Sequence, residues 1–166
     1  MEFSRHIARL LHEEHRSTIA MLEGLENMIA RAKKTAPDVN DPVSRKILQQ
    51  MIQTIEQEVS GHFAFEEAEL FTRLAEFGDE AIGEHLTQEH QAMLPIAEQA
   101  AAMANNAMNN GFSDAEWNDF RSLTGELIER MLAHIQKEEM ALLPMLEDLI
   151  DSETDMTLAQ AYSMQQ

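Results

Sequence analysis

The sequence contains no cysteine, and this absence excludes several kinds of site. Disulfides, thiolate zinc sites and iron–sulfur clusters all need cysteine sulfur, as does thiol redox chemistry. A metal bound by this chain therefore has no thiolate ligand from it.

Glycine and proline are scarce, with six and four residues among 166. This composition, rich in Ala, Leu, Met, Glu and Gln, favours an all-helical chain, and the length is typical of one domain with a buried core. No run of 18 apolar residues occurs, and charges interrupt the apolar positions of the first stretch, MEFSRHIARLLHEEH. The sequence therefore predicts no membrane span and no signal peptide, with a cytoplasmic location as the default.

Basic residues are also few, because 12 Lys and Arg stand against 30 Asp and Glu and give a net charge of −18. Nucleic acids and anionic membrane surfaces are bound by clustered Lys and Arg. The charge therefore argues against both as partners. Most of the acidic residues are expected to form a solvated surface.

Four long helical patterns, with apolar residues at three- and four-residue spacing, predict the fold. They span about residues 3–34, 43–76, 80–108 and 113–150. The breaks contain Pro, Asx and Gly, and Ser113 with Glu116 predicts a capping box for the last helix. Pro95 should kink the third helix or force a local break.

Four helices with short connections predict an all-α fold, an up-down-up-down antiparallel four-helix bundle over residues 1–150. Residues 151–166 are expected to form a short polar C-terminal tail, with a possible short helix at 158–164. No strand pattern competes with this interpretation.

The sequence repeats itself internally. HFAFEEAELFTRL, which begins at His62, and HIQKEEMALLPML, which begins at His134, share the pattern H-x-x-x-E-E-x-x-L-[FL]-x-x-L. EEHRSTIAML around His15 likewise resembles QEHQAMLPIA around His90, and the offsets of 75 and 72 residues are similar. We interpret this as a duplicated helical hairpin, in which each half supplies one lone His and one His-x-x-x-Glu pair.

Six polar residues lie in register with the apolar stripes and should face the core. With a rise of ~1.5 Å per residue, they fall in one layer of the predicted bundle to within about one turn. His and Glu four residues apart stand above one another on one helix face, so both can reach the same metal pair. The candidate metal ligands are His15, His62, Glu66, His90, His134 and Glu138.

A single His on an apolar stripe is more often a hydrogen-bonded core residue than a ligand. Two buried carboxylates in one layer, with no Lys or Arg on that stripe, are costly without cations, and this favours a metal site. His12 shares a face with His15 and is expected either to contact a ligand from outside or to be a fifth imidazole. Glu139 is the fallback for Glu138, and His6 and His85 lie off the layer.

Imidazole and carboxylate ligands suit iron, manganese or zinc. Two Glu residues are natural bridges between two ions, which leaves two His residues for each ion and open positions for solvent or a small molecule. The sequence therefore predicts a site for two metal ions.

These motifs resemble the hemerythrin-like, or HHE cation-binding, family over about residues 3–150. The resemblance implies a non-haem di-iron centre in a four-helix bundle, bridged by the two Glu carboxylates and an oxo or hydroxo group, with the four His residues as terminal ligands. Zinc or manganese are possible substitutes. The spacing departs from that of oxygen-carrying hemerythrins, because His85 and His90 are five residues apart and Glu138 follows His134 by four.

The resemblance implies a protein that binds dioxygen or nitric oxide for sensing, storage or stress defence, more a binding protein than an enzyme. Two alternatives stay open. One is an iron donor in iron–sulfur cluster repair, although the cysteine-containing N-terminal segment of such proteins is missing. The other is a di-iron enzyme that reduces peroxide or nitric oxide.

Overall fold

The computed structural model describes residues 2–165, and over this range every secondary-structure element is a helix, which confirms the all-α class. Met1 and Gln166, the outer ends of the two predicted segments, lie outside the described residues. We use η for π-helical turns. The elements are α1 (His6–Ala32), α2 (Pro42–Gln57), η1 (Glu58–Phe63), η2 (Glu66–Leu70), α3 (Phe71–Glu76), α4 (Ala81–Asn110), α5 (Asp114–Lys137), η3 (Glu138–Leu142), α6 (Leu143–Leu149) and α7 (Ser152–Met164).

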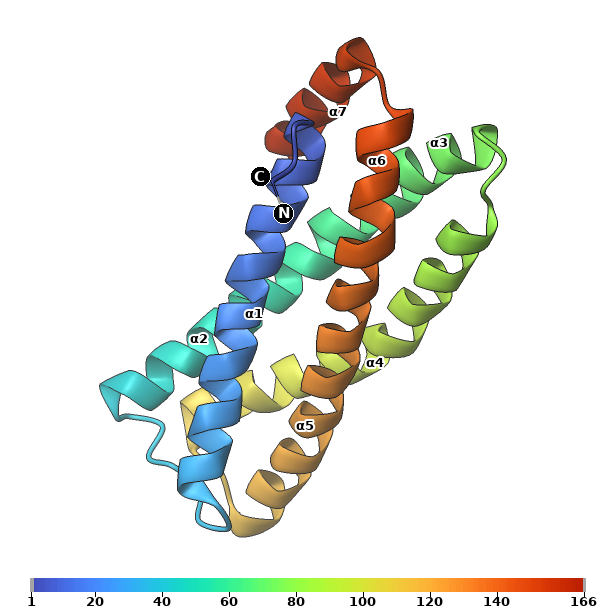
Figure 1. Cartoon of the computed structure of the whole chain (residues 1–166). Coiled ribbons are helices and arrows are strands. Elements are labelled where there is room, and N and C mark those ends of the chain that lie inside the picture. The colour runs from blue at the N-terminus through green and yellow to red at the C-terminus, as the bar shows by residue number, and fades with distance from the viewer. Residues whose placement is uncertain (1, 166) are drawn as a thin grey trace.

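The elements join into four long runs that lie side by side (Figure 1). The first run is α1, the second extends from α2 to α3, the third is α4, and the fourth extends from α5 to α6. Contacts connect α1 with α2, α2 with α4, α4 with α5, and α5 with α1, so each run packs against two others. Side chains that point inward from the four runs therefore meet in a common interior.

The ends of the runs follow the predicted breaks. Asp41 accepts a hydrogen bond from the Ser44 amide at the start of α2, and Ser113 and Glu116 form the predicted capping box. Gly78 and Gly111, at positive φ of 92° and 75°, follow the second and third runs, where a residue with a Cβ would be strained.

The helix α4 continues through Pro95 without a break. Of the two predicted outcomes, the local break is therefore wrong. The ribbon of α4 bends where its colour passes from green to yellow (Figure 1), as expected of a helix that lacks one backbone hydrogen bond.

The last segment differs from the expected polar tail. It forms the 13-residue helix α7, which is longer than the possible helix at 158–164 and packs against α1. The Asp155 carboxylate accepts hydrogen bonds of 2.9 Å from the amides of His6 and Ile7, and Leu158 and Tyr162 are buried. Because the first amides of a helix have no partners within it, this carboxylate stabilises the start of α1.

The apolar core is divided into two clusters by a buried polar layer. One cluster contains Trp117 and Phe120 and lies toward the loops after α1 and α4, and the other contains Leu11 and Phe65 and lies toward α7. The Trp117 indole donates a hydrogen bond to the Lys33 carbonyl at the end of α1. The polar layer therefore lies between two water-excluding cores.

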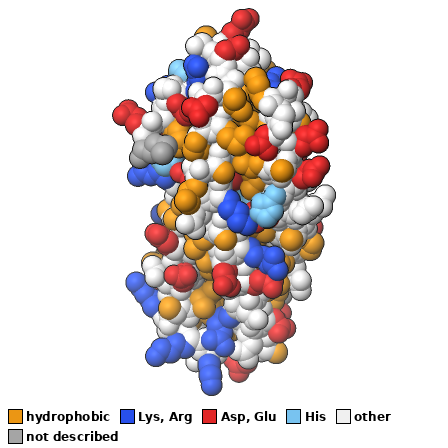
Figure 2. All heavy atoms as spheres, turned by 45° about the vertical axis from the view of Figure 1, so that its right-hand side comes forward, with side chains coloured by type: hydrophobic (Ala, Val, Ile, Leu, Met, Phe, Trp, Pro, Cys, Tyr) orange, Lys and Arg blue, Asp and Glu red, His pale blue; other side chains and the backbone are white. Residues whose placement is uncertain are grey.

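The surface shown in Figure 2 carries Asp and Glu side chains spread over the whole face, with apolar side chains gathered in its upper half. This distribution agrees with the expected solvated acidic surface. Within the described range, no helix has both the length and the apolarity that a membrane crossing requires.

Candidate metal centre

All six predicted residues meet in the buried polar layer, and each is 3% exposed or less. They form two groups of four residues whose ligand atoms lie within 4.8 Å of one another. Both groups contain Glu66 and Glu138, and they differ in their imidazoles. The first group adds His15 and His62, and the second adds His90 and His134. The arrangement is therefore that of two adjacent positions with two shared carboxylates.

The Nε2 atoms of the four imidazoles face the two carboxylates. Glu66 and Glu138 each approach imidazoles from both halves of the repeat, which is the geometry that a bridging ligand needs. The shortest Nε2–Oε distances are 3.1 Å from His62 and 3.3 Å from His90 to Glu66, and 2.7 Å from His134 and 3.6 Å from His15 to Glu138.

Several of these atoms have no hydrogen-bond partner although they are buried. They are Nε2 of His15, Nε2 of His62, both carboxylate oxygens of Glu66, and Oε2 of Glu138. The Nε2 atom of His62 lies 3.1 Å from Oε2 of Glu66, but the two are not aligned for a hydrogen bond. Unsatisfied buried polar atoms are costly, and a cation between them would satisfy all of them at once. The residues therefore fit a metal site.

π-Helical turns recur at the same place in both halves of the repeat. Glu66 begins η2 and Glu138 begins η3, while His62 lies within η1. Such turns are rare and are frequently found at functional sites. The extra residue in the turn shifts the following side chains around the helix. The shared distortion indicates that both helices are shaped by the same site.

The outward nitrogen of each imidazole also faces a carboxylate, and sequence reasoning missed this. The Nδ1 atoms of His15, His90 and His134 lie 2.8, 2.7 and 2.8 Å from carboxylates, namely those of Glu139, Glu67 and Glu89. Nδ1 of His62 lies 3.5 Å from Glu14 and 3.6 Å from Glu58. A carboxylate at Nδ1 holds the proton there and leaves Nε2 free to bind a metal.

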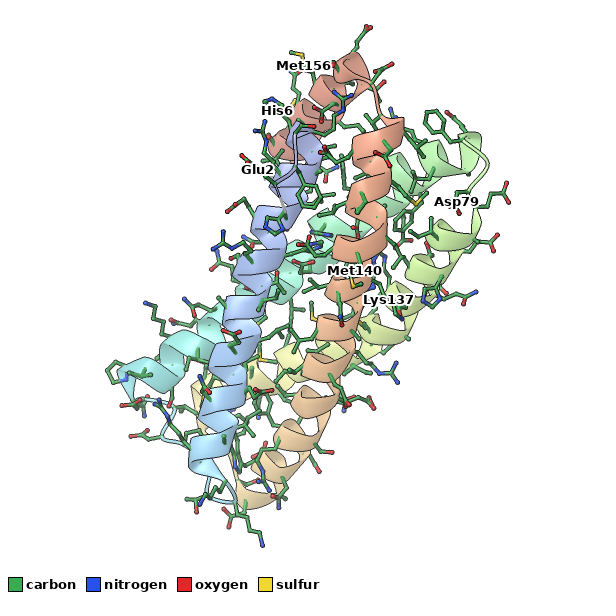
Figure 3. All side chains as sticks on the ribbon, viewed as in Figure 1. Glu2, His6, Asp79, Lys137, Met140 and Met156 are labelled. Atoms are coloured by element: carbon green, nitrogen blue, oxygen red, sulfur yellow. The ribbon has the colours of Figure 1, made fainter. Side chains whose placement is uncertain are left out.

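Glu139 and His12 both lie in this outer ring. Glu139 is outside both groups of four, and its carboxylate binds the imidazoles of His15 and His12. Over residues 2–165, the His12 imidazole pairs with the Glu139 carboxylate and with none of the six residues of the layer. The fallback of Glu139 for Glu138 as a ligand stays a prediction. His85 is exposed and contacts Lys137, which lies on the outside of α5 (Figure 3), and His6 is also exposed.

The repeat carried a signal for the outer ring. Glu14 and Glu89 directly precede the lone His of each half, and Glu67 and Glu139 directly follow the shared carboxylates. Each preceding Glu faces the His-x-x-x-Glu imidazole of its own half, and each following Glu faces the lone His of the other half. The doublets E-H and E-E therefore have a physical role in both halves.

The two halves are not electrostatically equal. Burial lowers the pKa of His62, but the charges of Glu66 and Glu58 outweigh burial and raise that pKa well above its usual value. Burial lowers the pKa of His134 to about 4. Burial raises the pKa of Glu66, but the nearby imidazoles of His62 and His90 outweigh burial and lower that pKa. Burial raises the pKa of Glu58.

Aromatic rings pack against the imidazoles of the layer. Phe63 stacks on His90 with ring centroids 3.9 Å apart, and the ring of Tyr162 stands edge-on to His62 at 6.4 Å. A surface pocket of about 490 Å³ between α3 and α4 is lined in part by Glu67 and Phe71, and Glu67 binds His90. The pocket therefore lies beside Glu67, on the outer side of His90.

The comparisons with known proteins agree with this geometry. The sequence model described as the hemerythrin HHE cation binding domain matches residues 6–146, which include all six residues and end before α7. No curated protein matches the chain. The buried His and Glu groups and the family match together indicate metal binding. The chain belongs to the hemerythrin HHE cation-binding domain family.

Proposed function

We propose that this protein is a non-haem di-iron carboxylate protein that binds dioxygen or nitric oxide for sensing, storage or stress defence. One observation carries the proposal: two buried groups of two imidazoles share the same two carboxylates. The proposal includes an up-down-up-down bundle made by the four long runs, and the cytoplasmic location expected from the sequence.

The proposal assigns a role to each of the six residues. His15 and His62 would hold one ion, His90 and His134 would hold the other, and Glu66 and Glu138 would supply carboxylate oxygens to both. Nitrogen and oxygen ligands without sulfur suit iron, with manganese and zinc as substitutes. Six protein ligands leave positions open on two six-coordinate ions, and an oxo or hydroxo bridge and the small molecule would occupy these.

The outer carboxylates and the two apolar clusters favour the binding of metal and gas in the layer. Glu139, Glu67 and Glu89 bind Nδ1 of His15, His90 and His134 and so orient these rings with Nε2 toward the centre. The two apolar clusters exclude bulk water above and below the layer. Bound iron would supply redox capacity and exchangeable coordination positions. A small uncharged gas suits a site enclosed in this way.

Optical spectra test this function. The iron-loaded protein is reduced without oxygen, and its spectrum is recorded before and after dioxygen or nitric oxide is added. The proposal predicts a new, stable absorption band that disappears when the gas is removed. Glu66→Ala, which removes a bridge, should give no such band. Oxidation of the iron without an adduct to either gas would contradict the proposal and favour redox chemistry or iron delivery.

A further inference from the structure

The two halves of the repeat place different groups behind their metal positions. At the repeat offsets, Thr18 corresponds to Met93 and Glu58 corresponds to Arg130. Glu58 is only 5% exposed, its Oε1 accepts a 2.7 Å hydrogen bond from the Thr18 hydroxyl, and its Oε2 lies 3.6 Å from Nδ1 of His62. Arg130 is half exposed and pairs with Glu126. The second half therefore has no counterpart of the buried carboxylate.

The charges around the two pairs of imidazoles differ as a result. Among the described residues, three carboxylates face the outer sides of the His15 and His62 pair, and they come from α1, η1 and η3: Glu14, Glu58 and Glu139. Two of the described carboxylates face the outer sides of the His90 and His134 pair, and they come from η2 and α4: Glu67 and Glu89. The second of these binds the ammonium of Lys137, which offsets its charge. The first position therefore lies in the more negative field.

We propose that Glu58 makes the two metal positions unequal, so that the ion at His15 and His62 carries the higher charge whenever the two ions differ by one electron. This inference rests on the proposed di-iron function. A carboxylate behind a ligating imidazole makes the imidazole a stronger donor, which favours the more positive ion. Burial strengthens the effect, since a charge away from water is poorly screened.

The test compares Glu58→Gln with Glu89→Gln, which removes a carboxylate charge at Nδ1 of His134. Both variants are loaded with iron, and the two one-electron potentials are measured by redox titration, with the mixed-valence state followed by electron paramagnetic resonance. The ion of higher charge is the second to be reduced, so its potential is the lower of the two. Glu58→Gln should raise this lower potential by about 59 mV, which is a tenfold change in the equilibrium constant of a one-electron reduction. The gap between the two potentials should therefore become narrower.

Glu89→Gln should instead raise the upper potential and widen the gap between the two steps. A gap that Glu58→Gln leaves unchanged or widens would overturn the inference. If Glu58→Gln does not retain two irons, Arg130→Glu decides the matter with every native carboxylate in place. This variant adds a carboxylate at the place in the second half that corresponds to Glu58. It should lower the upper potential and so narrow the gap between the two potentials. An unchanged gap overturns the inference.

Metal content separates this inference from the proposed function. A native chain that binds no iron contradicts the proposed function itself. The native chain and both glutamine variants could instead each hold two irons, with the two potentials shifted by the same amount in each variant. That result would contradict only the role of Glu58.

Discussion

Replacing Glu66 or Glu138 with alanine is expected to abolish metal retention, whereas replacing Glu67 or Glu139 should only weaken it. Glu66 and Glu138 belong to both groups of four, so either change removes a ligand atom from both positions. Glu67 and Glu139 contact only the outward nitrogen of an imidazole, and loss of such a partner typically lowers metal affinity about 10–100-fold.

The measurement is the metal content of each purified variant after dialysis against a weak chelator, with Glu13→Ala as the exposed control. Glu13 is 71% exposed in its side chain and should retain the native metal content. Equal metal loss from the Glu138 and Glu139 variants would show that the shared carboxylate on the fourth run is assigned wrongly.

Iron is expected to raise the melting temperature at pH 7, and the gain should vanish toward pH 5. Binding to the native state alone stabilises it by about 3–4 kcal/mol when free metal is 100–1,000 times its dissociation constant. Metal binding needs neutral imidazoles and ionised carboxylates, so protons compete with the metal as the pH falls.

The direction of the pH effect follows from His62. Burial lowers its pKa, but the charges of Glu66 and Glu58 outweigh burial and raise it well above 6.5, so this imidazole holds a proton in the metal-free chain near neutral pH. That proton stabilises the folded state of the metal-free chain. The stabilisation is complete below the unfolded pKa of about 6.5 and is lost as the pH rises through the higher folded pKa. Acid therefore favours the metal-free form over the metal-bound form.

His134 acts in the opposite direction on the metal-free chain. Burial lowers its folded pKa to about 4, so the native state takes up this proton less readily than the unfolded state as the pH falls from about 6.5. Melting curves from pH 7 to pH 5, with and without iron, measure the net result. If both forms melt together at pH 7, the six residues are a self-satisfied polar network and not a metal site.

The positions of the six residues could be predicted because helical geometry converts sequence spacing into direction. His and Glu four residues apart share one face, and the repeat placed the second set at the same height as the first. The structure brings all six together, and the capping box at Ser113 and the breaks between runs also follow the sequence. These features depend on local spacing or local chemistry.

Features that depend on contacts between distant segments could not be predicted. The helix α7 is short and weakly amphipathic, and it is fixed by the bonds of Asp155 to the amides of α1 and by the burial of Tyr162. The π-helical turns leave no mark in residue spacing, because they arise where the chain adapts to the packed layer. The role of Glu58 is visible only when its distances to Thr18 and His62 are known.

The most direct test of a two-metal centre is the number of metal ions in the native chain. The protein is expressed with iron supplied, purified at neutral pH, and examined by elemental analysis together with a protein determination by quantitative amino-acid analysis. Two groups of four ligands with two shared carboxylates predict about two ions per chain, with iron preferred. Zinc or manganese at the same ratio would change only the choice of metal. A chain that contains no metal under these conditions would contradict the centre itself.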